Sequence, residues 1–260
     1  MKTTIKLVLI YFAYQLVFGA AMMGLTYVWP IGQTAMLAWS LLLSGVAMTV
    51  HLAAFGYIDL RRALRPVGAD ALLCSTVCVV GGILFCNALS GFIILPDWLK
   101  SDFTALSHSV LGIFCIALLA PWVEELLFRG VILQRLNRGR KSPWRGIVIS
   151  ALVFGLIHVN PAQVFFAFLM GLVLGWITVQ THSLVPAIVG HVLNNSLSVA
   201  ELIAIDGNHK VTDYTILPIS TLLMTAFSGL LMILVTGWQL TQETPLDIET
   251  ENNLNNTKEK

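Results

Sequence analysis

A small set of ionisable and amide side chains stands out because it lies inside long apolar stretches. Its members are Glu124 and Glu125 in one stretch, His158 at the end of a second, and His191 and Asn195 in a third. Ionisable groups inside membrane-spanning helices are costly, usually face the protein interior and mark functional sites by default. Carboxylates and histidines are also the commonest acid–base groups in enzymes. We therefore start from these residues as the candidate functional centre.

The two adjacent glutamates are predicted to have different partners. Glu125 and Arg129 are four residues apart, with the acid on the N-terminal side, which is the better orientation for an ion pair on one helical face. Glu124 is rotated by ~100° around the helix and misses that partner. The spacing therefore predicts that Glu125 is a structural acid. Glu124 is then a spare buried carboxylate, which suits a general base or acid.

The remaining polar residues are predicted to lie at a similar depth. His191 and Asn195 are four residues apart and share a helical face. At a rise of ~1.5 Å per residue, Glu124 lies about 16 Å and His158 about 20 Å from the nearest cytoplasmic loop, His191 about 12 Å and Asn195 about 18 Å. Residues from three helices are thus expected to converge on one layer near the middle of the membrane.

The composition of the chain is that of a membrane protein. Of its 260 residues, 57% are hydrophobic and only 11% are charged, less than half of the roughly 25% charged residues in a soluble domain. A helix needs ~20 apolar residues to cross a bilayer core about 30 Å thick. Eight apolar stretches occur, at 6–28, 34–57, 70–95, 105–134, 145–159, 162–180, 184–205 and 214–238. We therefore predict an all-α, polytopic transmembrane bundle of about eight helices, the fifth being short.

The charges predict how the bundle is oriented. If the N-terminus is cytoplasmic and all eight stretches cross, twelve lysines and arginines fall inside and only Lys100 and Lys210 outside, as the positive-inside rule requires. Both termini are then cytoplasmic. Residues 1–240 are expected to form a single transmembrane domain, and the polar, acidic segment 241–260 a disordered cytoplasmic tail. A net charge of +1 gives no sign of a nucleic-acid partner.

Three motifs together resemble a known family. They are Glu124-Glu125-x-x-x-Arg129, Phe154-x-x-x-His158 and His191-x-x-x-Asn195, in this order and on separate predicted helices. This arrangement is similar to that of the CAAX-processing and bacteriocin-processing (CPBP) family, whose best-known members are the type II CAAX prenyl endopeptidases. The resemblance covers residues 105 to 205. Each motif alone is weak, whereas the three in order are specific, and all seven positions match.

The resemblance implies an intramembrane endopeptidase. Glu124 and His158 would position and deprotonate a water that attacks the scissile carbonyl. His191 and Asn195 would stabilise the oxyanion, which is often a large single contribution to catalysis. Three residues would have structural roles, Glu125 and Arg129 in holding their helix in place and Phe154 in packing beside the histidine one turn on.

The role of metal is left open by the residues. Glu124, His158 and His191 could provide three zinc ligands, with water at the fourth position. No H-E-x-x-H helix is present in the sequence. We favour the metal-free alternative, in which a glutamate and a histidine activate water and no cofactor is needed. The reason is that Asn195, on one face with His191, suits an oxyanion site better than a ligand set.

A second class of function uses the same buried polar cluster without proteolysis. Transporters build proton relays from buried acids and histidines, and a membrane scaffold or a bacteriocin-immunity factor could bind a partner protein. No inverted repeat or pair of broken helices indicates a transporter, and a scaffold has no reason to keep Glu124 unpaired. We therefore expect a peptide or membrane-protein substrate. Membrane lipids are the expected surroundings, most simply those of a bacterial cytoplasmic (inner) membrane.

Overall fold

Every regular element in the described part of the chain is helical. The computed structural model describes residues 2–139, 142–207 and 218–243. The first elements are α1 (Lys2–Leu25), α2 (Gln33–Ala54), α3 (Leu60–Ala63), α4 (Ala69–Ser90) and α5 (Lys100–Ser107). A continuous rod follows, made of α6 (Val110–Phe114), η1 (Cys115–Leu119), α7 (Ala120–Glu125), η2 (Leu126–Leu133) and α8 (Gln134–Asn137). The last elements are α9 (Trp144–Leu156), α10 (Pro161–Thr181), α11 (Val185–Gly207) and α12 (Ile219–Glu243).

The predicted polytopic helical bundle is confirmed. Among the described residues, seven helices are long and apolar enough to cross a membrane. The fifth apolar stretch is the exception, because α9 has only 13 residues, or about 20 Å at the usual helical rise. It ends just before Asn160-Pro161, as its short apolar run indicates.

The fourth predicted stretch, 105–134, is wrong at its start. The chain breaks at His108 and Ser109, between α5 and α6. The Ser109 hydroxyl accepts a hydrogen bond from the Gly112 amide at 3.3 Å, and serine is among the residues preferred as an N-cap. The membrane-spanning rod therefore begins at Val110 and continues to Asn137.

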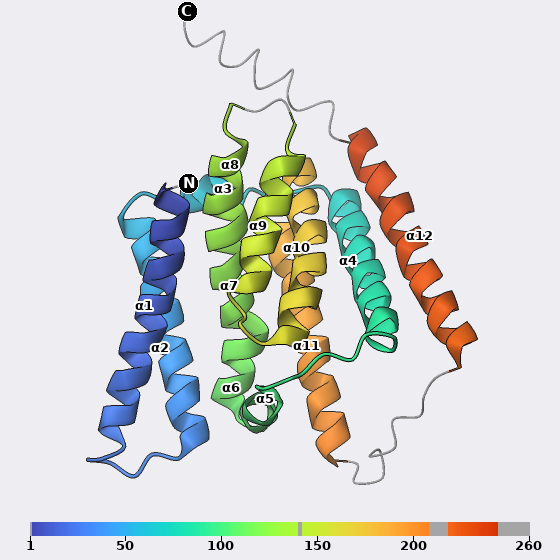
Figure 1. The fold of residues 1–260 in the computed structure, drawn as a ribbon. Helices are drawn as coiled ribbons and strands as arrows, with labels where there is room; N and C mark the ends of the chain where they lie inside the picture. Colours follow the sequence, from blue (N-terminus) through green and yellow to red (C-terminus); the bar gives the residue numbers. More distant parts are fainter. Residues whose placement is uncertain (1, 140–141, 208–217, 244–260) are drawn as a thin grey trace, which may run out of the picture.

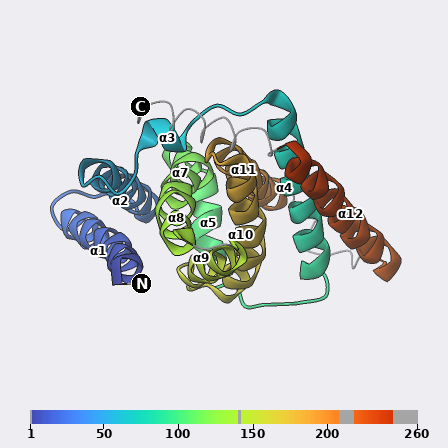
Figure 2. The same cartoon turned by 90° about the horizontal axis from the view of Figure 1, so that it is seen from above.

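The helices stand side by side, with the start of α1 and the end of α12 at the same end of the bundle (Figure 1). Seen from above, α1 and α2 form one flank and α4 and α12 the other, with the rod and α9 to α11 between them (Figure 2). Close backbone contact joins α4 to α12, because a Cβ on Gly81 would lie 2.7 Å from the Gly229 carbonyl oxygen. Small residues permit such approach between membrane helices.

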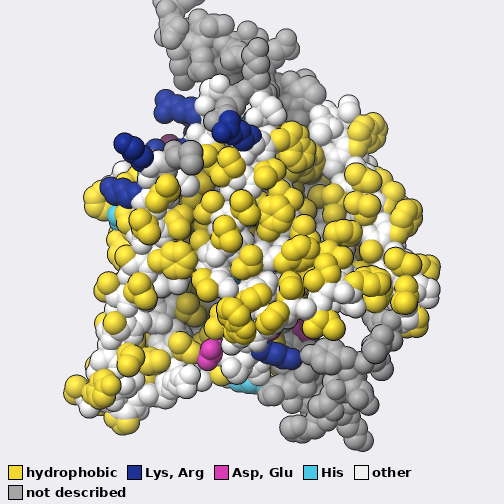
Figure 3. Space-filling view, in the orientation of Figure 1, with side chains coloured by type: hydrophobic (Ala, Val, Ile, Leu, Met, Phe, Trp, Pro, Cys, Tyr) yellow, Lys and Arg dark blue, Asp and Glu magenta, His cyan; other side chains and the backbone are white. Residues whose placement is uncertain are grey.

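The surface matches the predicted surroundings. Apolar side chains cover the visible flank of the bundle, and lysine and arginine side chains gather at the end where α1 begins (Figure 3). Helix α12 continues to Glu243, three residues into the predicted tail. The rest of that tail, 244–260, lies outside the described residues.

Candidate active site

The two glutamates lie where the long rod changes its helical pitch. α7, which carries Glu124 and Glu125, is flanked by the π-helical segments η1 and η2. Pro121 has no backbone N–H, so it cannot donate the α-helical bond to the carbonyl four residues before it. Such π-helical turns are frequent at functional sites. Both acids face the protein interior, with exposed fractions of 7% for Glu124 and 0% for Glu125.

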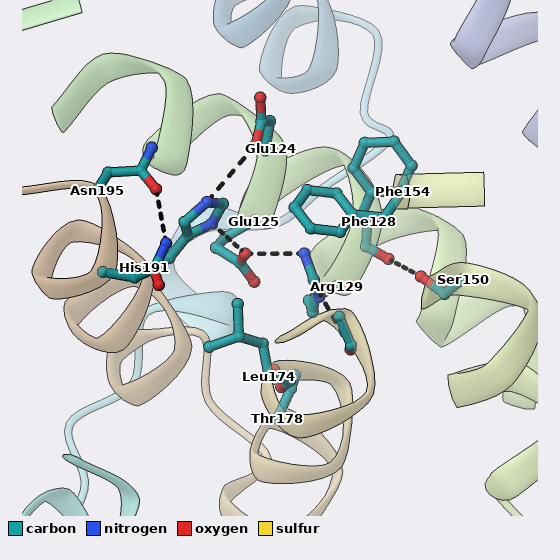
Figure 4. A network of polar contacts seen from close by, with 12 residues as sticks. Glu124, Glu125, Phe128, Arg129, Ser150, Phe154, Leu174, Thr178, His191 and Asn195 are labelled. Carbon is teal, nitrogen blue, oxygen red and sulfur yellow. Dashed lines mark hydrogen bonds and ion pairs between the residues drawn. The ribbon is translucent and has the colours of Figure 1, made fainter. Parts of the chain in front are cut away.

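The predicted ion pair is present and extends further than the spacing indicates. Arg129 Nη1 lies 2.8 Å from Glu125 Oε1, and Arg129 Nη2 donates to the Gly171 carbonyl oxygen of α10 at 3.3 Å. The guanidinium carbon also lies 4.3 Å above the centre of the Phe154 ring of α9. Arg129 therefore ties the rod to two neighbouring helices as well as neutralising Glu125 (Figure 4).

His191 of α11 connects both acids. Its Nδ1 is 2.7 Å from Glu125 Oε1, and its Nε2 is 3.7 Å from Glu124 Oε2. Because a carboxylate can only accept, Nδ1 donates to Glu125, which fixes the plane of the imidazole. The sequence predicted a structural role for Glu125 beside Arg129. It did not reveal this second partner, since nothing in a single sequence says which acid a distant helix meets.

His158 lies at the end of α9 and has a defined tautomer. Its Nδ1 is 2.9 Å from the Phe154 carbonyl oxygen, so Nδ1 carries a proton and the neutral ring leaves a lone pair on Nε2. The Phe154 ring contacts both histidines edge-on, at 5.0 Å from His158 and 5.7 Å from His191 between ring centres. Phe154 therefore packs against His158, as predicted, and also against His191. His158 makes no direct hydrogen bond or ion pair with Glu124.

Asn195 joins α11 to the first π-helical segment. Its Nδ2 donates to the Ile116 carbonyl oxygen at 2.8 Å, and its Oδ1 accepts from Asn194 Nδ2 at 3.1 Å. An amide nitrogen carries two protons, so one Asn195 N–H remains for another acceptor. Asn195 lies one turn beyond His191 on the same helical face, as predicted.

Tyr11 of α1 is a site residue that the sequence analysis missed. Its hydroxyl interacts with the carboxylate of Glu124 and with Gln15. Its ring packs against the apolar cluster that contains Leu126 and Leu127, the two residues that follow Glu125 on the rod. The only signal in the sequence is a tyrosine and a glutamine, four residues apart, within the apolar stretch that predicts the first membrane span.

The proposed zinc ligands do not assemble into one set. Glu124, His158 and His191 would all have to present lone pairs to the same ion at about 2 Å. Among the described residues, no group of three His, Cys, Asp or Glu side chains could hold a metal ion. His191 has its nitrogens directed at Glu125 and Glu124, and the Nδ1 of His158 is bound to a backbone carbonyl. In this arrangement the three candidate ligands are therefore not grouped around one position.

A family model matches the part of the chain that carries this cluster. Residues 106–197 match the model described as Rce1-like, type II CAAX prenyl endopeptidase. The matched segment contains all seven motif positions and confirms the resemblance seen in the sequence. No match was found among curated proteins or among solved structures.

Proposed function

We propose that this chain, whose core at 106–197 is of the Rce1-like, type II CAAX prenyl endopeptidase kind, hydrolyses peptide bonds with a water activated by Glu124 and His158. One observation carries the proposal. Of the two adjacent buried glutamates, Glu125 forms the ion pair with the arginine, whereas Glu124 lies next to a tyrosine and a histidine. A buried carboxylate without an arginine or lysine partner is expensive, and acid–base chemistry gives a reason for its presence.

The water would lie between Glu124 and Nε2 of His158. No direct hydrogen bond or ion pair joins the two side chains, so a water bound to both would be the link between them. Glu124 would take a proton from the water while the hydroxide oxygen forms a bond to the scissile carbonyl carbon. When the C–N bond breaks, the same proton passes to the leaving amine. Water and the peptide bond thus become a carboxylic acid and an amine, with no change in oxidation state.

His191 and Asn195 would stabilise the oxyanion. With Nδ1–H donated to Glu125, a doubly protonated His191 directs its Nε2–H toward the Glu124 side of the site. Two carboxylates, one guanidinium and one imidazolium then balance in charge, which lowers the cost of burying them. The second N–H of Asn195 supplies another donor. Removing one oxyanion donor typically costs about 10²–10³-fold in kcat.

The substrate we propose is a peptide held by the membrane. The family implies a peptide, and the site lies inside a bundle whose flanking helices have apolar outer faces, such as α1 with Leu16 72% exposed and α12 with Trp238 65% exposed. A peptide with an attached lipid or an apolar segment can reach it from the bilayer. Because the matched family is that of type II CAAX prenyl endopeptidases, a prenylated C-terminal peptide is the first substrate to test.

The test is cleavage by purified protein in proteoliposomes. A quenched fluorescent peptide with a prenylated C-terminal CAAX sequence is compared with the same peptide without the lipid, and mass spectrometry identifies the bond that is cut. We expect the prenylated peptide to be cleaved by the wild type and not by Glu124→Gln. Equal, undiminished cleavage by Glu124→Gln would overturn the mechanism. Failure of the wild type on a broad panel of lipidated and apolar peptides would support a non-proteolytic scaffold instead.

A further inference from the structure

The turn that follows His158 has an unfavourable backbone conformation. α9 ends at Leu156, and Val159 has φ = 59°. A β-branched residue in the left-handed region is a true outlier. Such conformations persist only where the surroundings enforce them, and they cluster at functional sites. Contacts from another part of the chain must therefore hold the turn in this conformation.

The side chain of Asn160 connects the turn to the segment between α4 and α5. Asn160 is 1% exposed, its Oδ1 accepts from the Trp98 backbone amide at 3.0 Å, and its Nδ2 donates to Asp97 Oδ1 at 2.7 Å. The amide orientation is fixed, because a backbone N–H can only meet the oxygen. Next to it, the Ala162 amide donates to the Pro96 carbonyl oxygen at 3.2 Å. Two segments some sixty residues apart are thus joined at three points.

This connection reaches the histidine within two residues. The Asn160 amide lies 2.6 Å from the His158 carbonyl oxygen, and the His158 amide lies 3.1 Å from the Gly155 carbonyl oxygen. Gly155 in turn allows close contact with α10, since a Cβ there would lie 2.6 Å from the Val164 carbonyl oxygen. The backbone on both sides of His158 is therefore fixed, which sets the direction of its Nε2.

We propose that Asn160 and Asp97 form a latch that positions His158 for water activation. The proposal rests on the function of His158 given above and makes Asn160 a positioning residue that does not touch the substrate. Without the latch, Val159 relaxes to negative φ and the ring of His158 loses its hydrogen bond to the Phe154 carbonyl. A displacement of about 1 Å can cost ~10²-fold in rate, so we expect kcat to fall and KM to stay within about twofold.

The test exchanges the two side chains. Asn160→Asp still accepts from the Trp98 amide, but it loses the donor and places a carboxylate against that of Asp97. In Asp97→Asn/Asn160→Asp, the new asparagine can donate to the new aspartate and the pair is restored. Asp97→Asn alone keeps an acceptor for Asn160 and serves as the mild control. We expect cleavage of the prenylated peptide to fall by ~10–100-fold in Asn160→Asp and to return to within about threefold in the double variant.

A second readout does not depend on cleavage. In protein with ¹⁵N-labelled histidines, the signal of His158 is assigned by its loss in His158→Gln, and its ¹⁵N shifts report which ring nitrogen carries the proton. We expect the Nδ1–H tautomer in the wild type and in the double variant, and a mixture in Asn160→Asp. An unchanged tautomer in Asn160→Asp overturns the latch even if no peptide is cleaved. A changed tautomer with undiminished kcat overturns its catalytic role. If Asn160→Asp changes the tautomer of His158 as expected but the wild type cleaves nothing, the proposed function alone is contradicted.

Discussion

Glu125 Oε1 accepts hydrogen bonds from both His191 Nδ1, at 2.7 Å, and Arg129 Nη1, at 2.8 Å. One oxygen thus joins the rod to α11 and holds an imidazole next to Glu124. Charge-assisted hydrogen bonds of this kind are about twice as strong as neutral ones. Glu125 therefore sets the orientation of a residue in the site in addition to neutralising an arginine.

Arg129→Lys should lower stability although it keeps the charge. A lysine can reach Glu125, but it cannot also form the hydrogen bond to the Gly171 carbonyl and stack on Phe154. Leaving a buried acceptor unpaired costs about 1–3 kcal/mol. Thermal unfolding in detergent should show a lower Tm than for the matched control Arg138→Lys, which changes an exposed residue. Equal melting temperatures would mean that the additional contacts of Arg129 contribute nothing.

Tyr11→Phe should slow cleavage without unfolding the protein. The substitution removes the hydroxyl that interacts with Glu124 and keeps the ring that packs on the apolar cluster. A hydroxyl next to a charged group contributes at most the roughly 1.5–3 kcal/mol of a hydrogen bond, so kcat should fall by up to about 100-fold. Tyr27→Phe, at an 82% exposed position, is the control. If both variants cleave like the wild type, Tyr11 has no part in the reaction.

The bundle could be predicted from the sequence because apolar length and charge distribution act locally. The Glu125–Arg129 pair also follows from spacing within one helix. The contact of Glu125 with His191 and that of Tyr11 with Glu124 join distant segments, and no periodicity specifies them. The break before α6 was missed because Ser109, its N-cap, lies in a stretch whose hydropathy is otherwise continuous.

The orientation of the bundle is tested by reporter fusions. The charge asymmetry predicts that the loops at 58–69 and 135–144 are cytoplasmic and those at 96–104 and 206–213 external; residues 208–217 lie outside the described part of the chain. Fusions after Arg138 and after Lys210 should report opposite sides of the membrane. If both fusions report the same side, the predicted number of membrane crossings between them is wrong. The 13-residue α9 is then the segment that does not cross.

Metal dependence is tested by elemental analysis and chelation. We predict that the purified protein contains no stoichiometric zinc and that cleavage continues in a strong chelator, because no three His, Cys, Asp or Glu side chains of the described residues are grouped to hold a metal ion. One zinc per chain, removed by the chelator together with activity and restored by added zinc, would refute the metal-free mechanism.

The most direct test of the central claim is to compare Glu124→Gln with Glu125→Gln for both cleavage and stability. Glu124→Gln removes the proton acceptor and should reduce kcat by ~10²–10⁴-fold with little change in folded yield, since Glu124 has no arginine or lysine partner. Glu125→Gln leaves Arg129 buried and uncompensated, which costs roughly 3–5 kcal/mol, so a low Tm and a low yield should be its main effects. If Glu124→Gln cleaves normally, or if it unfolds the protein while Glu125→Gln does not, the assignment of the two acids is contradicted.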